Sequence, residues 1–158
     1  MGIIGTVKDN PGVIARPPVI YLGALALGLG LHAAFRVPVL PVTVARILGV
    51  LLIVCAVAIV VSAFRAMARA GTSFRTERPT TAIVTDGPFG YTRNPIYVAL
   101  TLLYVGIAIN INALWVLLLI VPVMVVMQLG VIIREERYLE RKFGDEYLRY
   151  KARVRRWV

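Results

Sequence analysis

The stretch that decides the fold is Ile96–Ile133, which reads IYVALTLLYVGIAININALWVLLLIVPVMVVMQLGVII and holds no charged side chain. At about 1.5 Å per helical residue it measures roughly 57 Å, close to two crossings of a hydrocarbon core about 30 Å thick. The triplet Asn110, Ile111 and Asn112 near its middle is typical of a turn. The stretch therefore predicts a helical hairpin through a bilayer, with a single tilted helix as the weaker alternative.

The composition places the whole chain in the membrane class. Of its 158 residues, 59% are hydrophobic, and the mean hydropathy is +0.79, well above ordinary soluble composition. We expect an all-α integral membrane bundle of about four transmembrane helices, followed by a C-terminal cytosolic or interfacial helix. The four predicted spans are approximately Pro17–Phe35, Val44–Phe64, Pro95–Asn110 and Ala113–Ile133.

We expect a single membrane domain over residues 1–158. In chain order it would comprise two N-terminal spans (1–64), a cytosolic loop (65–94), the helical hairpin (95–133) and a cytosolic tail (134–158) that completes the site. In the tail, Tyr138, Leu139 and Phe143 recur at helical spacing. This spacing predicts an interfacial helix that ends at Gly144.

The net charge of +10 is distributed as a topology signal rather than as a nucleic-acid-binding surface. Fifteen of the 18 basic residues are Arg, and they gather beside the apolar spans, as in proteins that contact lipid headgroups. Of the 18 basic residues, 16 fall in the N-terminal segment, the 65–93 loop and the tail, whereas only Arg36 and Arg46 fall on the other side. The positive-inside rule then predicts that both termini and the loop are cytoplasmic, in a bacterial-type inner or plasma membrane. We expect no nucleic-acid partner.

The reactive residue types that many sites require are scarce. With His32 and Cys55 as the sole His and Cys, no metal site is expected. None of the eight acids lies inside a predicted span, whereas proton-coupled transporters usually need an ionisable group within the membrane. This argues against transport without eliminating it.

Two polar motifs flank the hairpin. Residues 87–97 read GPFGYTRNPIY, and residues 134–147 read REERYLERKFGDEY, running on to VRRW at 154–157. A hairpin returns both motifs to the same membrane face. From about Thr85 to the C-terminus, the pair resembles the isoprenylcysteine carboxyl methyltransferase family and is similar to the related membrane phospholipid methyltransferases.

The resemblance implies an integral-membrane enzyme that uses S-adenosylmethionine without a Rossmann domain and releases S-adenosylhomocysteine. The residues that match the family's motifs are Arg93, Pro95, Tyr97, Glu135, Glu136 and, in the tail, Arg156. Two positions depart from the pattern, because Asn94 replaces the usual histidine and Ala99 the usual glycine. The first departure argues against a proton-transfer role at position 94 and leaves a hydrogen-bonding role.

The chemistry of the cofactor agrees with these side chains. Carboxylates suit its sulfonium, ammonium and ribose diol, whereas Arg93, Arg156 and the helix start at Pro95 suit its carboxylate. Tyrosine faces suit the adenine ring or the sulfonium. We predict catalytic roles for Glu135, Arg93 and Arg156. The predicted cofactor-binding residues are Gly87, Tyr91, Arg93, Asn94, Pro95, Tyr97, Glu135, Glu136, Tyr147 and Tyr150.

The predicted acceptor is a lipophilic molecule that enters from the bilayer. A prenylcysteine-like carboxylate would need no general base, whereas an amine on a lipid headgroup would first have to lose a proton. The sequence leaves these acceptors open, and it leaves the oligomeric state open as well. The alternative is a small four-helix membrane transporter or scaffold that retains the motif shell without catalysis.

Overall fold

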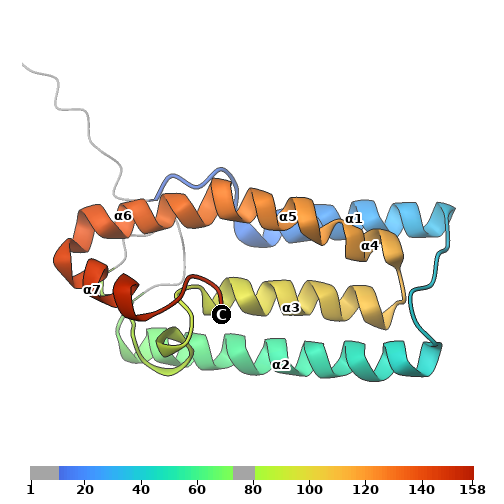
Figure 1. Ribbon diagram of the computed structural model, residues 1–158, viewed down its shortest axis with the longest axis horizontal. Coiled ribbons are helices and arrows are strands. Elements are labelled where there is room, and N and C mark those ends of the chain that lie inside the picture. The colour runs from blue at the N-terminus through green and yellow to red at the C-terminus, as the bar shows by residue number, and fades with distance from the viewer. Residues whose placement is uncertain (1–10, 73–80) are drawn as a thin grey trace, which may run out of the picture.

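The computed structural model describes residues 11–72 and 81–158, and every regular element in these ranges is helical (Figure 1). Three stretches are long and apolar enough to cross a membrane, and a shorter apolar helix accompanies them. The predicted all-α membrane bundle is confirmed. The elements are α1 (Pro17–Ala34), α2 (Val42–Arg69), the 3-10 turn η1 (Gly87–Gly90), α3 (Pro95–Asn110), α4 (Leu114–Leu118), α5 (Ile120–Met127), the π-helical turn η2 (Gln128–Ile132), α6 (Ile133–Phe143) and α7 (Asp145–Arg153).

The sequence predicted that the fourth span ends at Ile133, but the helix continues beyond this residue. The helix that contains this span runs for 30 residues, Leu114–Phe143, so α6 follows the apolar part without a break. Glu135, Glu136 and Glu140 therefore lie on the same continuous helix as the fourth apolar span, in the charged part that follows it. Charges from Arg134 onward hid the continuation, because backbone hydrogen bonds extend a helix through polar residues as readily as through apolar ones.

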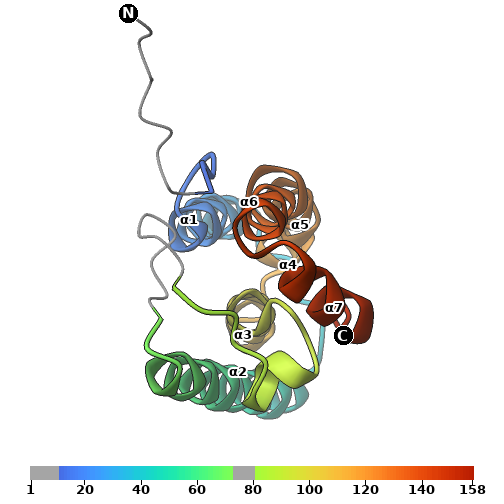
Figure 2. The same cartoon turned by 90° about the vertical axis from the view of Figure 1, so that its left-hand side faces the viewer.

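Seen end-on, α3 lies in the middle of the bundle, with α2 on one side and α1, α5 and α6 on the other (Figure 2). Small residues allow α2 and α3 to approach closely. A Cβ added at Gly49 would lie 2.5 Å from the Cβ of Asn110, and one at Gly106 would lie 2.9 Å from Ile53. Close approach through small residues is a common way to hold membrane helices together.

The predicted turn between the third and fourth spans is confirmed at Asn112, which has a positive φ of 56°. Its Oδ1 accepts hydrogen bonds from the backbone N–H groups of Val39 (2.7 Å) and Leu40 (3.0 Å), and its Nδ2 donates to the Leu40 carbonyl (2.7 Å). Asn tolerates this left-handed conformation better than most residues. One side chain thus ties the α1–α2 connection to the hairpin turn.

The opposite end of the bundle, where α1 and α3 begin and α2 and α6 end, is hereafter the site end. Gly144 has a φ of 51° and ends α6 as predicted. The chain turns there, and α7 leaves the line of α6 (Figure 1). The C-terminal segment continues to the start of α3, where Thr92 and Arg155 form an isolated parallel bridge. Segments from both predicted motifs therefore meet at this end.

Candidate active site

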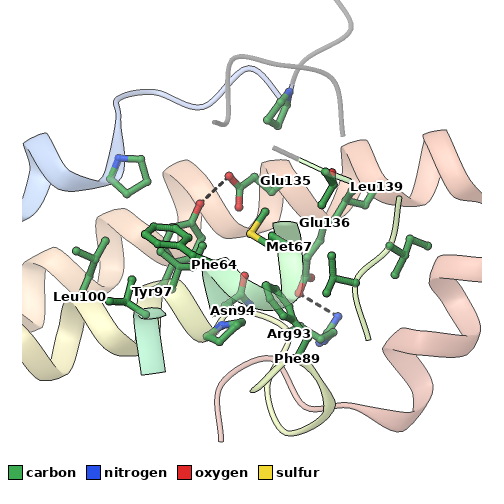
Figure 3. A pocket seen from close by; sticks show the side chains of 18 of the residues that line it. Phe64, Met67, Phe89, Arg93, Asn94, Tyr97, Leu100, Glu135, Glu136 and Leu139 are labelled. Atoms are coloured by element: carbon green, nitrogen blue, oxygen red, sulfur yellow. Dashed lines mark hydrogen bonds and ion pairs between the residues drawn. The ribbon is translucent and has the colours of Figure 1, made fainter. Parts of the chain in front are cut away.

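A cavity of about 720 Å³ lies at the site end, within the range of roughly 300–1,000 Å³ that is usual for ligand sites. Its polar wall comes from the start of α3, from α6 and from α7, and Figure 3 shows the labelled side chains around it. Its apolar wall comes from the start of α1 and the last turns of α2. The residues of that wall are Pro17, Pro18, Val19, Val60, Phe64 and Met67.

Glu136 is held between two arginines. Its Oε1 lies 3.0 Å from Arg93 Nη1, and Arg156 donates to both carboxylate oxygens, at 2.9 Å and 2.7 Å. The hydrogen bond with Glu136 raises the pKa of Arg156 above its ordinary value. Since Glu136 is only 5% exposed, the two cations neutralise a carboxylate that would otherwise be buried at high cost.

The C-terminal segment fixes the start of α3 and thereby positions Arg93. The Arg93 backbone N–H donates to the Arg155 carbonyl at 2.9 Å. The Arg156 carbonyl accepts from Thr92 Oγ1 at 3.1 Å and from Asn94 Nδ2 at 2.9 Å. Asn94 is the N-cap residue of α3, but its side chain makes no capping hydrogen bond. Its amide binds the tail instead, while the residue still lines the cavity.

Glu135 is in a different environment from its neighbour. It is half-buried, lines the cavity, and accepts a hydrogen bond from the Tyr97 hydroxyl at 2.7 Å, as the dashed line in Figure 3 marks. Among the described residues, no arginine or lysine forms an ion pair with it. The cavity therefore contains one carboxylate that a tyrosine orients and that protein cations leave uncompensated.

Two buried tyrosines of α7 complete the polar wall. Burial, together with the nearby Glu136 charge, raises the pKa of Tyr147 to about 12, and the Arg93 guanidinium partly opposes this rise. Burial likewise raises the pKa of Tyr150, whose hydroxyl donates to the Phe89 carbonyl at 2.8 Å. Both hydroxyls therefore stay protonated near neutral pH and act as hydrogen-bonding groups without charge.

Most of the predicted site residues line this one cavity, namely Arg93, Asn94, Pro95, Tyr97, Glu135, Glu136, Tyr147 and Tyr150. Gly87, Tyr91 and Arg156 do not. Gly87 starts η1 with a φ of 59°, and the Tyr91 side chain is 82% exposed. Arg156 reaches the site only through Glu136. Ala99, at the second departure from the family pattern, is buried inside α3 and does not line the cavity.

Sequence reasoning missed the wall opposite the motifs. Arg16, Phe64 and Met67 line the cavity although they lie before or within the first two spans, far from either motif. Apolar side chains in a membrane helix have the same sequence signature whether they face lipid, a neighbouring helix or a cavity. Arg16 carried a weak signal as a basic residue directly before an apolar span, a position that predicts topology rather than a place in a cavity wall.

Comparisons with known proteins identify the family of the chain. A model of the phospholipid methyltransferase family matches residues 44–146, which is more than half of the chain. An uncharacterized protein of Haemophilus influenzae is 74% identical over 27 residues, and the match covers 17% of this chain and 43% of that protein. No solved structure matches the chain. The helical membrane bundle, the motif-lined cavity and the family match together establish that this chain belongs to the phospholipid methyltransferase family, whose members use S-adenosylmethionine.

Proposed function

We propose that the protein is an integral-membrane S-adenosylmethionine-dependent methyltransferase that methylates an amine on a lipid headgroup. The observation that carries this proposal is Glu135, a cavity carboxylate bonded to Tyr97 and uncompensated by any described cation. A carboxylate in this state favours cationic or proton-donating ligands over anionic ones. It therefore favours an amine acceptor over a prenylcysteine-like carboxylate, and the name of the family points the same way.

The residues present fit the cofactor. Arg93 lines the cavity, and its Nε is buried without a hydrogen-bond partner among the described residues. A buried donor left unpaired costs about 1–3 kcal/mol, which the cofactor's carboxylate would offset. Tyr147 and Tyr150 offer aromatic faces and neutral hydroxyl groups on the same wall. We assign the cofactor to this polar end of the cavity, with Glu136 holding Arg93 in place.

The acceptor would enter through the apolar wall. Val19 on α1 and Phe64 on α2 both line the cavity and are 58% and 39% exposed. Exposed apolar side chains on two neighbouring walls of the cavity support an opening between α1 and α2 toward the hydrocarbon. A lipid could then place its headgroup in the cavity while its chains stay in the bilayer.

Methyl transfer requires alignment, exclusion of water and removal of one proton. When bound, the cofactor supplies an electrophilic methyl group on its sulfonium. Glu135 accepts a proton from the headgroup ammonium, and Tyr97 keeps the receiving oxygen in place. With the cofactor held beside Arg93, the neutral nitrogen would accept its methyl group, with a C–N bond formed, the C–S bond broken and the bonding pair left on a neutral sulfur. Glu135 returns its proton to water.

We infer that the site end faces the cytoplasm, where the cofactor is available. The support is the distribution of charge, since the sequence has 16 basic residues in its N-terminal segment, 65–93 loop and tail and only two, Arg36 and Arg46, elsewhere. Of these, Lys8, Arg75 and Arg78 lie outside the described residues.

The first test is titration of S-adenosylhomocysteine into the purified protein in detergent, followed by transfer of a labelled methyl group. We expect saturable binding and methylation of an amine-bearing phospholipid. Methylation of a prenylcysteine carboxylate alone would show that the acceptor is a carboxylate and not a headgroup amine. The absence of binding by a folded protein would make transport or scaffolding the leading function.

Replacement of Glu135 tests the central residue. We expect Glu135→Gln to lower the rate of methyl transfer by about 100-fold or more, because the amine loses its proton acceptor. Thermal unfolding should change little, since the glutamine retains the volume and can still accept from Tyr97. Glu140→Gln is a matched control, because Glu140 lies on the same helix outside the cavity. An unchanged rate for Glu135→Gln would remove this residue from the reaction.

A further inference from the structure

Among the described residues, two cationic side chains line the cavity, Arg93 and Arg16, and they belong to different walls. Arg93 lies on the α3 side, is 9% exposed and pairs with Glu136. Arg16 directly precedes the first residue of α1, next to the apolar residues that reach the outer surface. The two arginines are therefore placed for different ligands.

The backbone around Arg16 is fixed on both sides. Its carbonyl accepts the N–H of Val19 at 2.9 Å and begins α1, whose first two residues are prolines without N–H groups. Before it, Ile14 N–H donates to the Gly130 carbonyl at 3.2 Å, and Gly12 O accepts from Arg134 Nη1 at 3.0 Å. The segment 11–16 thus lies across η2 and α6 and fixes the position of Arg16 (Figure 1).

The position of Arg16 along the membrane normal suits a phosphate. It precedes a membrane helix by one residue, which places it at the level where lipid phosphates lie. Guanidinium groups bind phosphate through two parallel hydrogen bonds. In addition, Arg16 and Glu135 line one cavity, so opposite charges face a single ligand space. A zwitterionic headgroup carries the complementary pair, a phosphate anion and an ammonium a few bonds apart.

We propose that Arg16 is a specificity-determining residue that binds the phosphate of the acceptor lipid while Glu135 receives its amine. This inference rests on the proposed function for the identity of the acceptor, but it concerns a residue outside both sequence motifs. The protein should therefore discriminate between an amine lipid that carries a phosphate and one that lacks it.

The test compares two acceptors in mixed micelles, a phosphatidylethanolamine and a phosphate-free long-chain amine. For Arg16→Gln we expect the KM for the phospholipid to rise about tenfold or more, with kcat little changed and the KM for the phosphate-free amine unchanged. Arg16→Lys should recover part of the loss. Arg69→Gln is the matched control, because Arg69 is an exposed arginine at the same end of the bundle that does not line the cavity.

A binding measurement separates this inference from the proposed function. A short-chain phosphatidylcholine accepts no further methyl group, so its affinity is measured at equilibrium, with S-adenosylhomocysteine titrated separately. We expect Arg16→Gln to lower the affinity for the phospholipid about tenfold and to leave the affinity for S-adenosylhomocysteine unchanged. If inorganic phosphate at an equal concentration displaced the phospholipid, Arg16 would be assigned to free phosphate rather than to the lipid.

Three outcomes would overturn the inference. Weakened S-adenosylhomocysteine binding would assign Arg16 to the cofactor, an equal loss for both acceptors would show a general defect, and unchanged phospholipid affinity would remove Arg16 from recognition. Phospholipid binding that depends on Arg16 without any turnover would instead keep the inference and contradict the proposed function.

Discussion

At the scale of single residues, the two adjacent glutamates have opposite environments. Consecutive helical residues point about 100° apart, so Glu136 turns toward Arg93 and Arg156 while Glu135 turns toward Tyr97 and the cavity. One carboxylate is neutralised by the protein and the other is left for a ligand. We therefore propose a structural role for Glu136 and a chemical role for Glu135.

The structural role of Glu136 gives a prediction about stability. Glu136→Gln keeps the volume but leaves Arg93, which is 9% exposed, without its counter-charge. Removing one partner of such a buried pair costs about 3 kcal/mol or more, so we expect the unfolding midpoint in detergent to fall by roughly 6 °C or more. Glu140→Gln should cost about 1 kcal/mol at most, because the Glu140–Lys151 pair is about one-third exposed. Equal midpoints for the two variants would contradict this assignment.

The sequence predicted most of the polar residues that line the cavity but not which way each motif residue points. Arg93, Tyr97 and Glu135 were identified because polar residues concentrated beside an apolar run are conspicuous. Tyr91 belongs to the same motif, yet its side chain is exposed, because the 3-10 turn before it directs it outward. Side-chain direction in such short turns depends on tertiary contacts, such as the hydrogen bonds that the Thr92 and Asn94 side chains donate to the Arg156 carbonyl.

At the scale of elements, the bundle depends on contact between α2 and α3. Along α2 the buried residues are all small, namely Ala45, Gly49, Ala56, Ala63 and Ala66. Large side chains on the same helix, such as Leu51 and Val54, are exposed and face the bilayer. This is the reverse of a soluble helix, in which the large apolar residues are buried.

This packing predicts the effect of enlarging a glycine. Gly49→Leu places a Cβ 2.5 Å from Asn110 and forces α2 and α3 apart, so we expect a marked loss of thermal stability and of folded yield. Gly23→Leu on α1 is the control, because nothing lies within 4 Å of a Cβ at that position. Unfolding midpoints measured in the same detergent compare the two. Similar losses at both positions would contradict the packing argument.

The helix bounds show why the sequence located some elements better than others. α3 begins at Pro95 and ends at Asn110, as predicted, because a proline and a turn-forming asparagine bound it. The bounds of α2 and of the last span were predicted too short. No turn-forming residue directly follows Phe64 or Ile133. Hydropathy alone shows where the apolar part of a helix stops, not where the helix itself ends.

At the scale of the whole molecule, orientation is the property that most needs measurement. We expect the α1–α2 connection to face away from the cytoplasm and α7 to face it, because the basic residues are so unequally divided. In a Cys55→Ala background, Val39→Cys should react with an impermeant thiol reagent in intact cells. Ala152→Cys should react only after permeabilisation. The reverse pattern would invert the molecule in the membrane.

The arrangement of α1 and α2 also bears on how such proteins diversify. Both helices pack against the hairpin rather than against each other, and the cavity lies between them. The family match begins at residue 44 and therefore leaves out α1 and the segment that carries Arg16. We therefore expect α1, which would form one side of the proposed acceptor opening, to vary more in sequence than the residues that hold Arg93 and Glu136. Grafting residues 11–34 from a relative should then alter the range of lipids accepted and spare the affinity for S-adenosylhomocysteine.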